Sequence, residues 1–180
     1  MAAPFSITPA FPADAPEIAD IYAHHVLHRV ATFETVPPDT TEMAARMLKV
    51  ADGGYPWITA RDVGGTMLGY AYAGPFHPRA AYRPTCEDSV YLRHDRLGMG
   101  IGTALLSALI TECEERGFRQ MIALIAGTEP ASVALHERAG FVHAGRLANV
   151  GRKFGKWLDV LYMQRPLGPG SDAPPMAEPQ

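Results

Sequence analysis

Three glycines, Gly98, Gly100 and Gly102, lie two residues apart between a strand-like segment and a helix-like segment. The residues before them, 89–92, mix β-branched, aromatic and aliphatic side chains, as strands do. The residues after them carry apolar side chains at helical spacing. Backbone N–H groups at the start of a helix lack partners within the helix and lie at the positive end of its dipole. Because glycine has no Cβ to keep a ligand away, the pattern predicts an anion site suited to phosphate.

Several explanations compete for these glycines. No Gly-Lys-Ser/Thr follows them, which argues against a P-loop, and residues 98–102 lack the G-x-G-x-x-G spacing of a dinucleotide-binding fold. Gly100-Ile101-Gly102 resembles the pyrophosphate loop of the GNAT N-acetyltransferases, Gln/Arg-x-x-Gly-x-Gly/Ala, which follows a central strand and opens a helix. The remaining explanation is that the glycines only form a tight strand-to-helix turn.

Further segments make this resemblance specific. Residues 132–141, SVALHERAGF, look like the second GNAT signature, Asn-x-x-Ala/Ser-x-x-Leu-Tyr/His-x-x-x-Gly-Phe, at the family's distance from the glycines. Residues 82–92 and 150–159 resemble the phosphinothricin and methionine sulfone/sulfoximine acetyltransferases, in which Thr-x-Glu-x-Ser-Val-Tyr-Val and Val-Gly-x-Lys-x-Gly-x-Trp-x-Asp recur. The similarity extends over residues 5–165.

This resemblance implies a fold and an activity. The expected fold is α/β (α+β), a mixed, mostly antiparallel GNAT sheet that splays after its central strand and is flanked by helices. Acetyl-CoA is expected in the cleft. The implied reaction transfers an acetyl group from acetyl-CoA to the α-amino group of a small amino acid or analogue, by direct attack in a ternary complex. Relatives in this subgroup are commonly dimers, so a homodimer is expected.

The resemblance also implies which residues contact the cofactor. Two of them depart from the family pattern: Leu97 stands where Gln or Arg is usual, and Glu129 stands where Asn is usual. The backbone amides around Tyr91 and Leu92 would polarise the acetyl carbonyl, as an oxyanion hole does. The expected cofactor-binding residues are Val90, Tyr91, Leu92, Leu97, Gly98, Met99, Gly100, Ile101, Gly102, Thr103, Glu129 and Ser132.

Two residues are candidates for proton transfer. Amide formation needs a neutral amine, so a base must remove the ammonium proton. Glu87, at the start of the central strand, is placed to do so directly or through a water, whereas Asp88 alternates to the opposite face. His136 stands where many relatives have a tyrosine that protonates the departing thiolate. Histidine can donate that proton, or it can hydrogen-bond the cofactor or orient the substrate.

The substrate pocket is expected to include an arginine, because planar bidentate binding of carboxylate favours it. Arg83 precedes the central strand and aligns with the arginine of the subgroup's Tyr/Phe-Arg-x-Thr-x-Glu pattern. Phe33 and Glu34, in the loop after the first helix, are expected to wall the same pocket. Lys153 and Trp157 belong to a late hairpin and are expected to complete the pocket from a neighbouring subunit.

The elements that must position these residues follow from local patterns. Asp14 to Glu17 and Asp39 to Glu42 have the composition of helix starts, and glycines 117 and 140 are placed to end helices. The expected elements are strands at 5–8, 57–61, 67–73, 89–92, 120–126, 141–147 and 158–164, and helices from 14, 39–50, from 101 and from 130. The last two strands are expected to be joined by residues 149–156.

Composition limits the alternatives. The 180 residues suit one domain, expected over 1–165, followed by a disordered proline-rich tail over 166–180. A net charge of -3 lacks the basic footprint of a nucleic-acid or membrane-surface protein. Cys86 and Cys113 lack companions at metal spacing, and there is no long apolar run, so a cytoplasmic protein with reduced thiols is expected. His24 and His28 are four apart, yet without a third ligand they are expected to be structural or surface residues, and no metal is expected.

Two other functions stay open. One is a non-catalytic acyl-CoA-binding protein on a decayed scaffold, favoured by Leu97 and Glu129. The other is acetylation of protein or peptide N-termini, which would need an open groove with acidic walls. Glu87 and Arg83 argue against the first, and the basic loop at Arg83 argues against the second.

Overall fold

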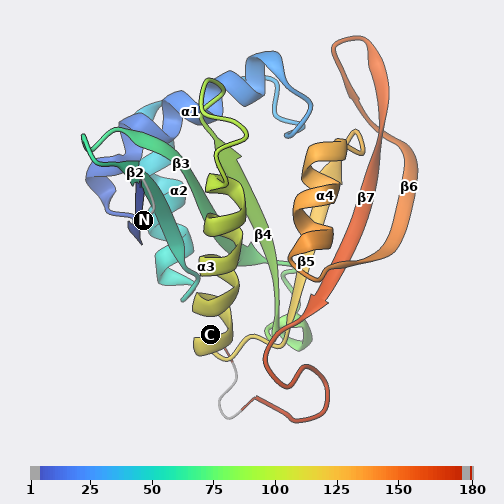
Figure 1. Ribbon diagram of the computed structural model, residues 1–180. Coiled ribbons are helices and arrows are strands. Elements are labelled where there is room, and N and C mark those ends of the chain that lie inside the picture. The colour runs from blue at the N-terminus through green and yellow to red at the C-terminus, as the bar shows by residue number, and fades with distance from the viewer. Residues whose placement is uncertain (1–4, 176–178, 180) are drawn as a thin grey trace.

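The computed structural model describes residues 5–175 and 179. These residues form one seven-stranded sheet with the order β1-β2-β3-β4-β5-β7-β6, flanked by helices (Figure 1). The strands are β1 (Phe5–Pro9), β2 (Trp57–Asp62), β3 (Met67–Pro75), β4 (Thr85–Leu92), β5 (Gln120–Ala126), β6 (Val142–Lys153) and β7 (Lys156–Pro166). The helices are α1 (Ala15–His28), α2 (Thr40–Asp52), α3 (Ile101–Glu115) and α4 (Pro130–Arg138), with short 3-10 turns η1 (Pro12–Asp14) and η2 (Ala80–Tyr82).

The helix boundaries follow from the capping residues in the sequence. Asp39 precedes α2, and its side chain accepts a hydrogen bond from the backbone N–H of Glu42. Gly117 and Gly140 follow α3 and α4 with φ of 90° and 84°, values that glycine adopts without steric cost. The predicted helices and strands are therefore confirmed in type and in order.

The last hairpin differs from the prediction. Its strands, β6 and β7, extend into the segment 149–156 that was expected to be a connection, and only Phe154 and Gly155 remain between them. Asn149 has a φ of 54°, and the register shifts between Leu147 and Gly151. This bulge allows β6 to continue through a polar, glycine-containing stretch whose composition is typical of a loop. The hairpin rises beyond the rest of the sheet in Figure 1.

The sheet opens between its two parallel strands. β4 and β5 pair in parallel only from Thr85 and Gln120 to Asp88 and Ala123, whereas every other pair of neighbouring strands is antiparallel. Beyond that point β4 continues beside β3 and β5 continues beside β7, so the two strands diverge (Figure 1). The expected splay after the central strand is confirmed, and it exposes the backbone of one side of β4.

Two hydrophobic layers cover the two faces of the sheet. On one face α1 and α2 pack on side chains such as Tyr70 and Tyr91. On the other face α3 packs through Leu105 and Leu109, together with α4, against the central strands. Alternate residues of β4 therefore belong to different layers. Glu87, Ser89 and Tyr91 share the α1–α2 side, and Asp88, Val90 and Leu92 share the α3–α4 side.

The C-terminal segment is folded further than expected. β7 runs to Pro166, and Leu167 is fully buried in the core rather than part of a disordered tail. Backbone N–H groups of Leu167 and Gly168 donate to Arg119 and Glu114. A local composition rich in proline gives no sign of these long-range contacts, and residues 176–178 and 180 of the expected tail lie outside the described residues. No helix among the described residues is long and apolar enough to cross a membrane.

Candidate active site

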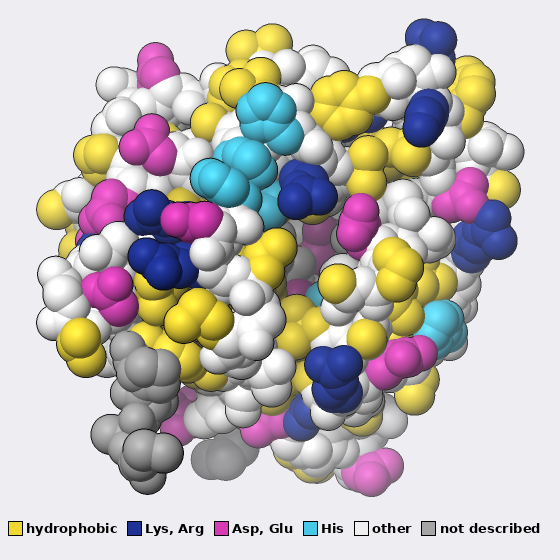
Figure 2. Space-filling model, turned by 45° about the horizontal axis from the view of Figure 1, so that its top comes forward, with side chains coloured by type: hydrophobic (Ala, Val, Ile, Leu, Met, Phe, Trp, Pro, Cys, Tyr) yellow, Lys and Arg dark blue, Asp and Glu magenta, His cyan; other side chains and the backbone are white. Residues whose placement is uncertain are grey.

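A cavity of about 540 Å³ fills the space opened by the splay. Side chains from both layers line it, because β4 and β5 no longer separate them. Figure 2 shows a hollow in the corresponding face, with histidine side chains gathered beside it. Lining residues on the α1–α2 side include Phe33, Tyr72, Glu87 and Ser89, and those on the α3–α4 side include Asp88, Val90, Leu135 and His136.

Glu87 is the carboxylate placed on the α1–α2 side of this cavity. It is only partly exposed, and it pairs with Gly74 of β3, two residues before Ser89 on β4. Burial, with a further contribution from the negative charge of Asp88, raises its pKa to about 7. A carboxylate with this pKa is a competent proton acceptor near neutral pH, because a large fraction is ionised there and the ionised form holds a proton more strongly than a solvated carboxylate does.

The open side of β4 presents backbone amides to the cavity. The N–H of Arg93 donates to the carbonyl of Leu68 on β3. Because N–H groups alternate sides along a strand, that of Tyr91 also faces β3, and those of Val90 and Leu92 face the side that β5 has left. The structure thus refines the expectation about Tyr91 and Leu92: the amides available to polarise a carbonyl are those of Val90 and Leu92.

A buried ion pair lies at the α4 side of the cavity. The ring of His136 has its Nδ1 2.7 Å from the carbonyl oxygen of Ser132 and its Nε2 3.0 Å from Oδ2 of Asp88. The side chains are 6% and 2% exposed. Burial alone would lower the pKa of His136, but the hydrogen bond and charge of Asp88 and the Ser132 carbonyl outweigh it, so the pKa is raised. Both ring nitrogens are therefore engaged inside the protein.

The glycine turn at the start of α3 is open at two of its three glycines. Gly98 and Gly100 have φ of 76° and 77°, and a Cβ added at either would have nothing within 4 Å. Gly100 is the N-cap of α3 and no side chain of the described residues caps the helix. Gly102 is different: it is buried, and an added Cβ would lie 3.4 Å from Leu92 and 3.7 Å from Leu135. A methyl group there would therefore make ordinary contacts with both side chains, whereas the surroundings of Gly98 and Gly100 are empty.

Donors at this turn fit a pyrophosphate group. The first backbone N–H groups of α3, at Ile101, Gly102 and Thr103, precede the first intrahelical bond from Ala104 to Gly100. Gly98 and Gly100 carry no Cβ that would keep a phosphate group away from these N–H groups. Leu97 lines the cavity, whereas Gly98 to Thr103 lie beyond it at the helix start. The observed geometry matches an extended anionic ligand whose one end enters the cavity.

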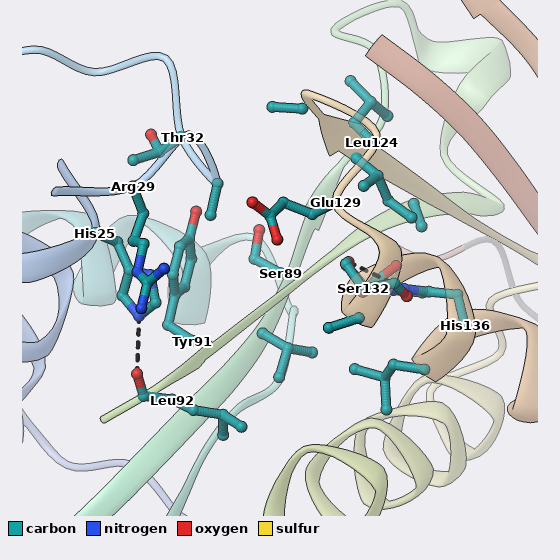
Figure 3. A pocket seen from close by; sticks show the side chains of 18 of the residues that line it. His25, Arg29, Thr32, Ser89, Tyr91, Leu92, Leu124, Glu129, Ser132 and His136 are labelled. Carbon is teal, nitrogen blue, oxygen red and sulfur yellow. Dashed lines mark hydrogen bonds and ion pairs between the residues drawn. The ribbon is translucent and has the colours of Figure 1, made fainter. Parts of the chain in front are cut away.

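The rim of the cavity carries opposite charges on opposite sides. Figure 3 shows Arg29 on the α1 side and Glu129, the N-cap of α4, facing it across the cavity. Among the described residues, Arg29 is the only arginine or lysine that lines the cavity. His25 lies behind it, with Nε2 2.8 Å from the Leu92 carbonyl oxygen, and burial lowers the pKa of that imidazole.

The histidines beside the hollow pack against one another. His24 stacks on His94 with ring centroids 4.0 Å apart and lies 4.9 Å from His28. Within the part of the chain that the structure describes, no three His, Cys, Asp or Glu residues are arranged to hold a metal ion. Ring stacking accounts for the proximity of these histidines.

Several residues expected in the substrate pocket lie elsewhere in a single chain. Glu34 is bound by Arg46, at 2.7 and 3.2 Å, and by the Tyr22 hydroxyl at 2.9 Å, which makes it part of the α1–α2 packing. Arg83 is exposed after η2 and does not line the cavity. Trp157 is 62% exposed on β7.

Lys153 supports the pocket rather than lining it. Its Nζ donates to the Thr32 carbonyl oxygen at 2.7 Å, and burial lowers its pKa. Two residues earlier, Gly151 accommodates the ring of Phe33, because a Cβ there would lie 2.3 Å from the ring. The hairpin of the same chain thus fixes the loop that carries Phe33, which does line the cavity.

Sequence reasoning did not assign several cavity residues. Asp88 was set aside because it alternates away from Glu87, yet both faces of β4 open into the cavity once β5 departs. Arg29 ends α1 without any motif around it. Others come from the loop after α1 or from separate strands and carry no local signal; they are Thr32, Tyr72, Ser89, Leu124, Val160 and Tyr162.

Comparison with known protein families finds a match over most of the chain. The model of the acetyltransferase (GNAT) domain matches residues 7–162. Phosphinothricin N-acetyltransferase of Alcaligenes faecalis is 52% identical over 164 residues, covering 90% of this chain and 82% of that protein. The L-methionine sulfoximine/L-methionine sulfone acetyltransferase of Pseudomonas paraeruginosa is 41% identical and covers 94% of this chain and 98% of that protein.

Solved structures agree with the sequence comparison. The crystal structure of a GNAT superfamily phosphinothricin acetyltransferase from Sinorhizobium meliloti, in complex with acetyl-CoA, superimposes with a TM-score of 0.94 at 46% identity. It covers 96% of this chain, and this chain covers 94% of it. The fold expected from the sequence is therefore confirmed over nearly the whole chain.

Proposed function

This chain belongs to the GNAT acetyltransferase family, and from that premise we propose that it transfers an acetyl group from acetyl-CoA to the α-amino group of small amino acids and their analogues. Phosphinothricin, methionine sulfone and methionine sulfoximine represent the substrate class, because the relatives that cover most of this chain are named for them. One observation carries the proposal: Glu87 lines the cavity at the splay, and the open glycine turn begins directly after Leu97, which lines the same cavity.

The glycine turn and the open side of β4 are the proposed binding site for acetyl-CoA. The amides at the start of α3 would hold the pyrophosphate, and the amides of Val90 and Leu92 would hold and polarise the acetyl carbonyl. Acetyl-CoA supplies the acetyl group as a reactive thioester. Leu97 and Glu129 contribute no cationic or amide donor, so backbone groups carry most of the pyrophosphate binding.

Glu87 is the proposed catalytic base. It accepts a proton from the substrate ammonium group, which leaves a neutral amine able to attack the acetyl carbonyl carbon. Its raised pKa, about 7, suits this task, and Tyr72 and Phe33 line the cavity on the same side. His136 is proposed to assist the departing thiolate as a nearby positive charge, because both of its ring nitrogens already have partners.

We assign the substrate carboxylate to Arg29 rather than Arg83. Arg29 reaches the cavity in the same chain as Glu87, and a guanidinium binds a carboxylate through two parallel hydrogen bonds. Arg83 remains outside the cavity of a single chain. A substrate held between Arg29 and Glu87 presents an amino group to the base and a carboxylate to the cation, as an α-amino acid requires.

A second copy of the chain is the proposed partner. The β6–β7 hairpin and the adjoining part of β5 expose large apolar side chains, namely Leu124, Val142, Leu147, Val150, Phe154 and Trp157. A monomer rarely leaves so many together. A homodimer through this surface would bring Trp157 of one copy beside its partner, which is how this residue was expected to act.

The free, buried Cys86 and Cys113 fit a reducing, cytoplasmic location.

The test is a thiol-release assay with acetyl-CoA and a panel of acceptors. We expect CoA release with phosphinothricin, methionine sulfone, methionine sulfoximine or ordinary α-amino acids, and little with amines that lack a carboxylate. Release only with peptides would favour acetylation of protein N-termini. Binding of acetyl-CoA in calorimetry with no release for any acceptor would favour a non-catalytic acyl-CoA-binding protein.

A further inference from the structure

Asp88 lies between Glu87, the proposed catalytic base, and His136, the proposed positive charge beside the departing thiolate. It follows Glu87 on β4, so their side chains lie on opposite faces of the strand. The side chain of Asp88 is 2% exposed, and its Oδ2 binds His136 Nε2 at 3.0 Å. The splay lets Glu87, Asp88 and His136 all line one cavity. One buried carboxylate is therefore adjacent to both functional groups.

The partners of His136 determine its protonation state. A neutral imidazole carries one N–H and can donate only one hydrogen bond. His136 faces two acceptors, the Ser132 carbonyl oxygen at 2.7 Å and the Asp88 carboxylate at 3.0 Å. A carbonyl oxygen cannot donate, so Nδ1 must carry a proton. A carboxylate at Nε2 then requires a second proton there, which makes the ring an imidazolium.

We propose that Asp88 is a positioning residue that keeps His136 as an imidazolium cation and also acts across β4 on Glu87, so that one carboxylate sets the protonation of both. This inference rests on the proposed acetyltransferase function. Asp88 does not take part in the chemistry itself. It fixes the orientation of the His136 ring and supplies the charge that both neighbours experience.

The electrostatics of the two neighbours agree in sign. Burial lowers the pKa of His136, and the hydrogen bond and charge of Asp88 more than reverse that effect. Burial raises the pKa of Glu87, and the charge of Asp88 adds to it. Loss of the Asp88 charge would therefore lower both pKa values. Without that charge, the active form, in which Glu87 is ionised and His136 is protonated, would be populated over a pH range shifted to lower values.

Other ionisable groups face the same cavity and must be considered. They are His25 and Arg29 of α1, Tyr72 of β3, Tyr91 of β4, His94 after β4, Glu129 at the start of α4 and Tyr162 of β7. None of them hydrogen-bonds Glu87, Asp88 or His136 within the described residues. Asp88 is thus the group whose charge both neighbours share at shortest range.

The first test is performed on the resting wild-type protein. Nitrogen-15 NMR of the histidine rings, with the His136 signal identified by its absence in His136→Gln, reports the protons on Nδ1 and Nε2. We expect both to be protonated at pH 7 and to titrate above the ordinary value of about 6.5. A His136 that is neutral at pH 7 and titrates at or below that value would overturn the proposal. This result does not depend on catalysis.

The second test compares pH–rate profiles. Asp88→Asn keeps the shape and an acceptor for Nε2–H but removes the charge. A nearby opposite charge shifts a pKa by about 1–3 units, so the falling limb of kcat/KM should move by that amount to lower pH. The rising limb should move in the same direction as Glu87 loses its negative neighbour. Thermal unfolding verifies that the variant is folded, and if it is not, the wild-type NMR titration decides.

Asp62→Asn is the matched control. Asp62 lies at the β2–β3 turn, where its side chain accepts from the N–H groups of Gly64 and Thr66, and asparagine can accept both bonds. It removes the same charge far from the cavity, and both limbs should stay in place. A falling limb that Asp88→Asn leaves unmoved, or a rising limb that does not shift, would contradict the shared role. If wild type releases no CoA with any acceptor, the proposed function fails while the NMR result stands on its own.

Discussion

Glu87 has a pKa of about 7, so the proposed reaction should depend on pH through its ionisation. Below that pH Glu87 carries a proton and cannot accept another, whereas above it the carboxylate is free. We expect kcat/KM for an amino acid to rise with pH through about 7. Glu87→Gln should lower kcat at neutral pH by about 10²–10⁴-fold and leave the KM for acetyl-CoA little changed.

The loss in Glu87→Gln should shrink as pH increases, because more of the amine is then neutral without help from the enzyme. Initial rates from pH 6 to 9 for both proteins measure this. A variant with full kcat across the range would show that solvent takes the proton and that Glu87 only positions the substrate.

Arg29 and Arg83 can be separated by substitution. If Arg29 holds the substrate carboxylate, Arg29→Ala should reduce kcat/KM for α-amino acids by about ten- to a hundredfold, the loss of roughly 1.5–3 kcal/mol of charge-assisted bonding. Most of the change should be in KM. Arg83→Ala, which removes an exposed cation outside the cavity, is the matched control. A larger effect from Arg83→Ala would show that the β3–β4 loop, its own or a partner's, reaches the substrate.

Residues such as these mark the limit of prediction from sequence. Glu87 and His136 were found because they stand within recognisable motifs, and both line the cavity. Glu34 does not line the cavity of a single chain, and the ion pair with Arg46 of α2 that holds it there is invisible to local patterns. Asp88 was set aside by a correct rule of strand alternation, since the rule does not show that a splay opens both faces of the strand.

At the scale of elements, the glycine turn offers a direct test of acetyl-CoA binding. Gly100→Ala adds a methyl group where the pyrophosphate would approach, and it forces alanine to a φ of 77° at a cost of roughly 1–2 kcal/mol. Gly65→Ala is matched, because Gly65 has a φ of 84° and no atom within 4 Å of an added Cβ, yet it lies in the β2–β3 turn.

Both glycine variants should lower the unfolding midpoint to a similar extent. Only Gly100→Ala should raise the Kd for acetyl-CoA, by about ten- to a hundredfold if one charge-assisted bond is lost. Isothermal titration calorimetry measures the Kd. Equal Kd values for the two variants would mean that the turn is purely structural. Gly102 is a less direct test because its added methyl group would contact Leu92 and Leu135 instead of empty space.

The elements themselves were predictable because capping residues, glycines and apolar spacing act locally. Asp39, Gly117 and Gly140 end or start helices where they were expected to. The extent of the last hairpin and the folding of the segment after β7 were not predictable from the sequence, because both depend on contacts with distant residues. Leu167 is buried through the core around α3, and β6 continues past Asn149 only because β7 pairs with it.

The whole molecule presents an apolar surface on the β6–β7 hairpin that we assign to a second copy. A stable interface buries on the order of 800 Å² per partner, and aromatic residues at its centre carry much of the energy. Trp157, 62% exposed, is the largest of these side chains. We expect wild type to be a dimer by light scattering at micromolar concentration and Trp157→Arg to be mainly monomeric.

Val63→Arg is the matched control for the dimer, because Val63 is 96% exposed at the β2–β3 turn, far from the hairpin along the sheet order. It changes an apolar side chain that is even more exposed than Trp157 to the same cation, and the protein should remain a dimer. The Trp157→Arg monomer should keep its unfolding midpoint and its acetyl-CoA Kd if the interface lies apart from the glycine turn. Its KM for amino acids should rise if the partner completes the substrate pocket, as expected for Trp157. A wild-type protein that stays monomeric at high concentration would instead leave the hairpin surface to a different partner.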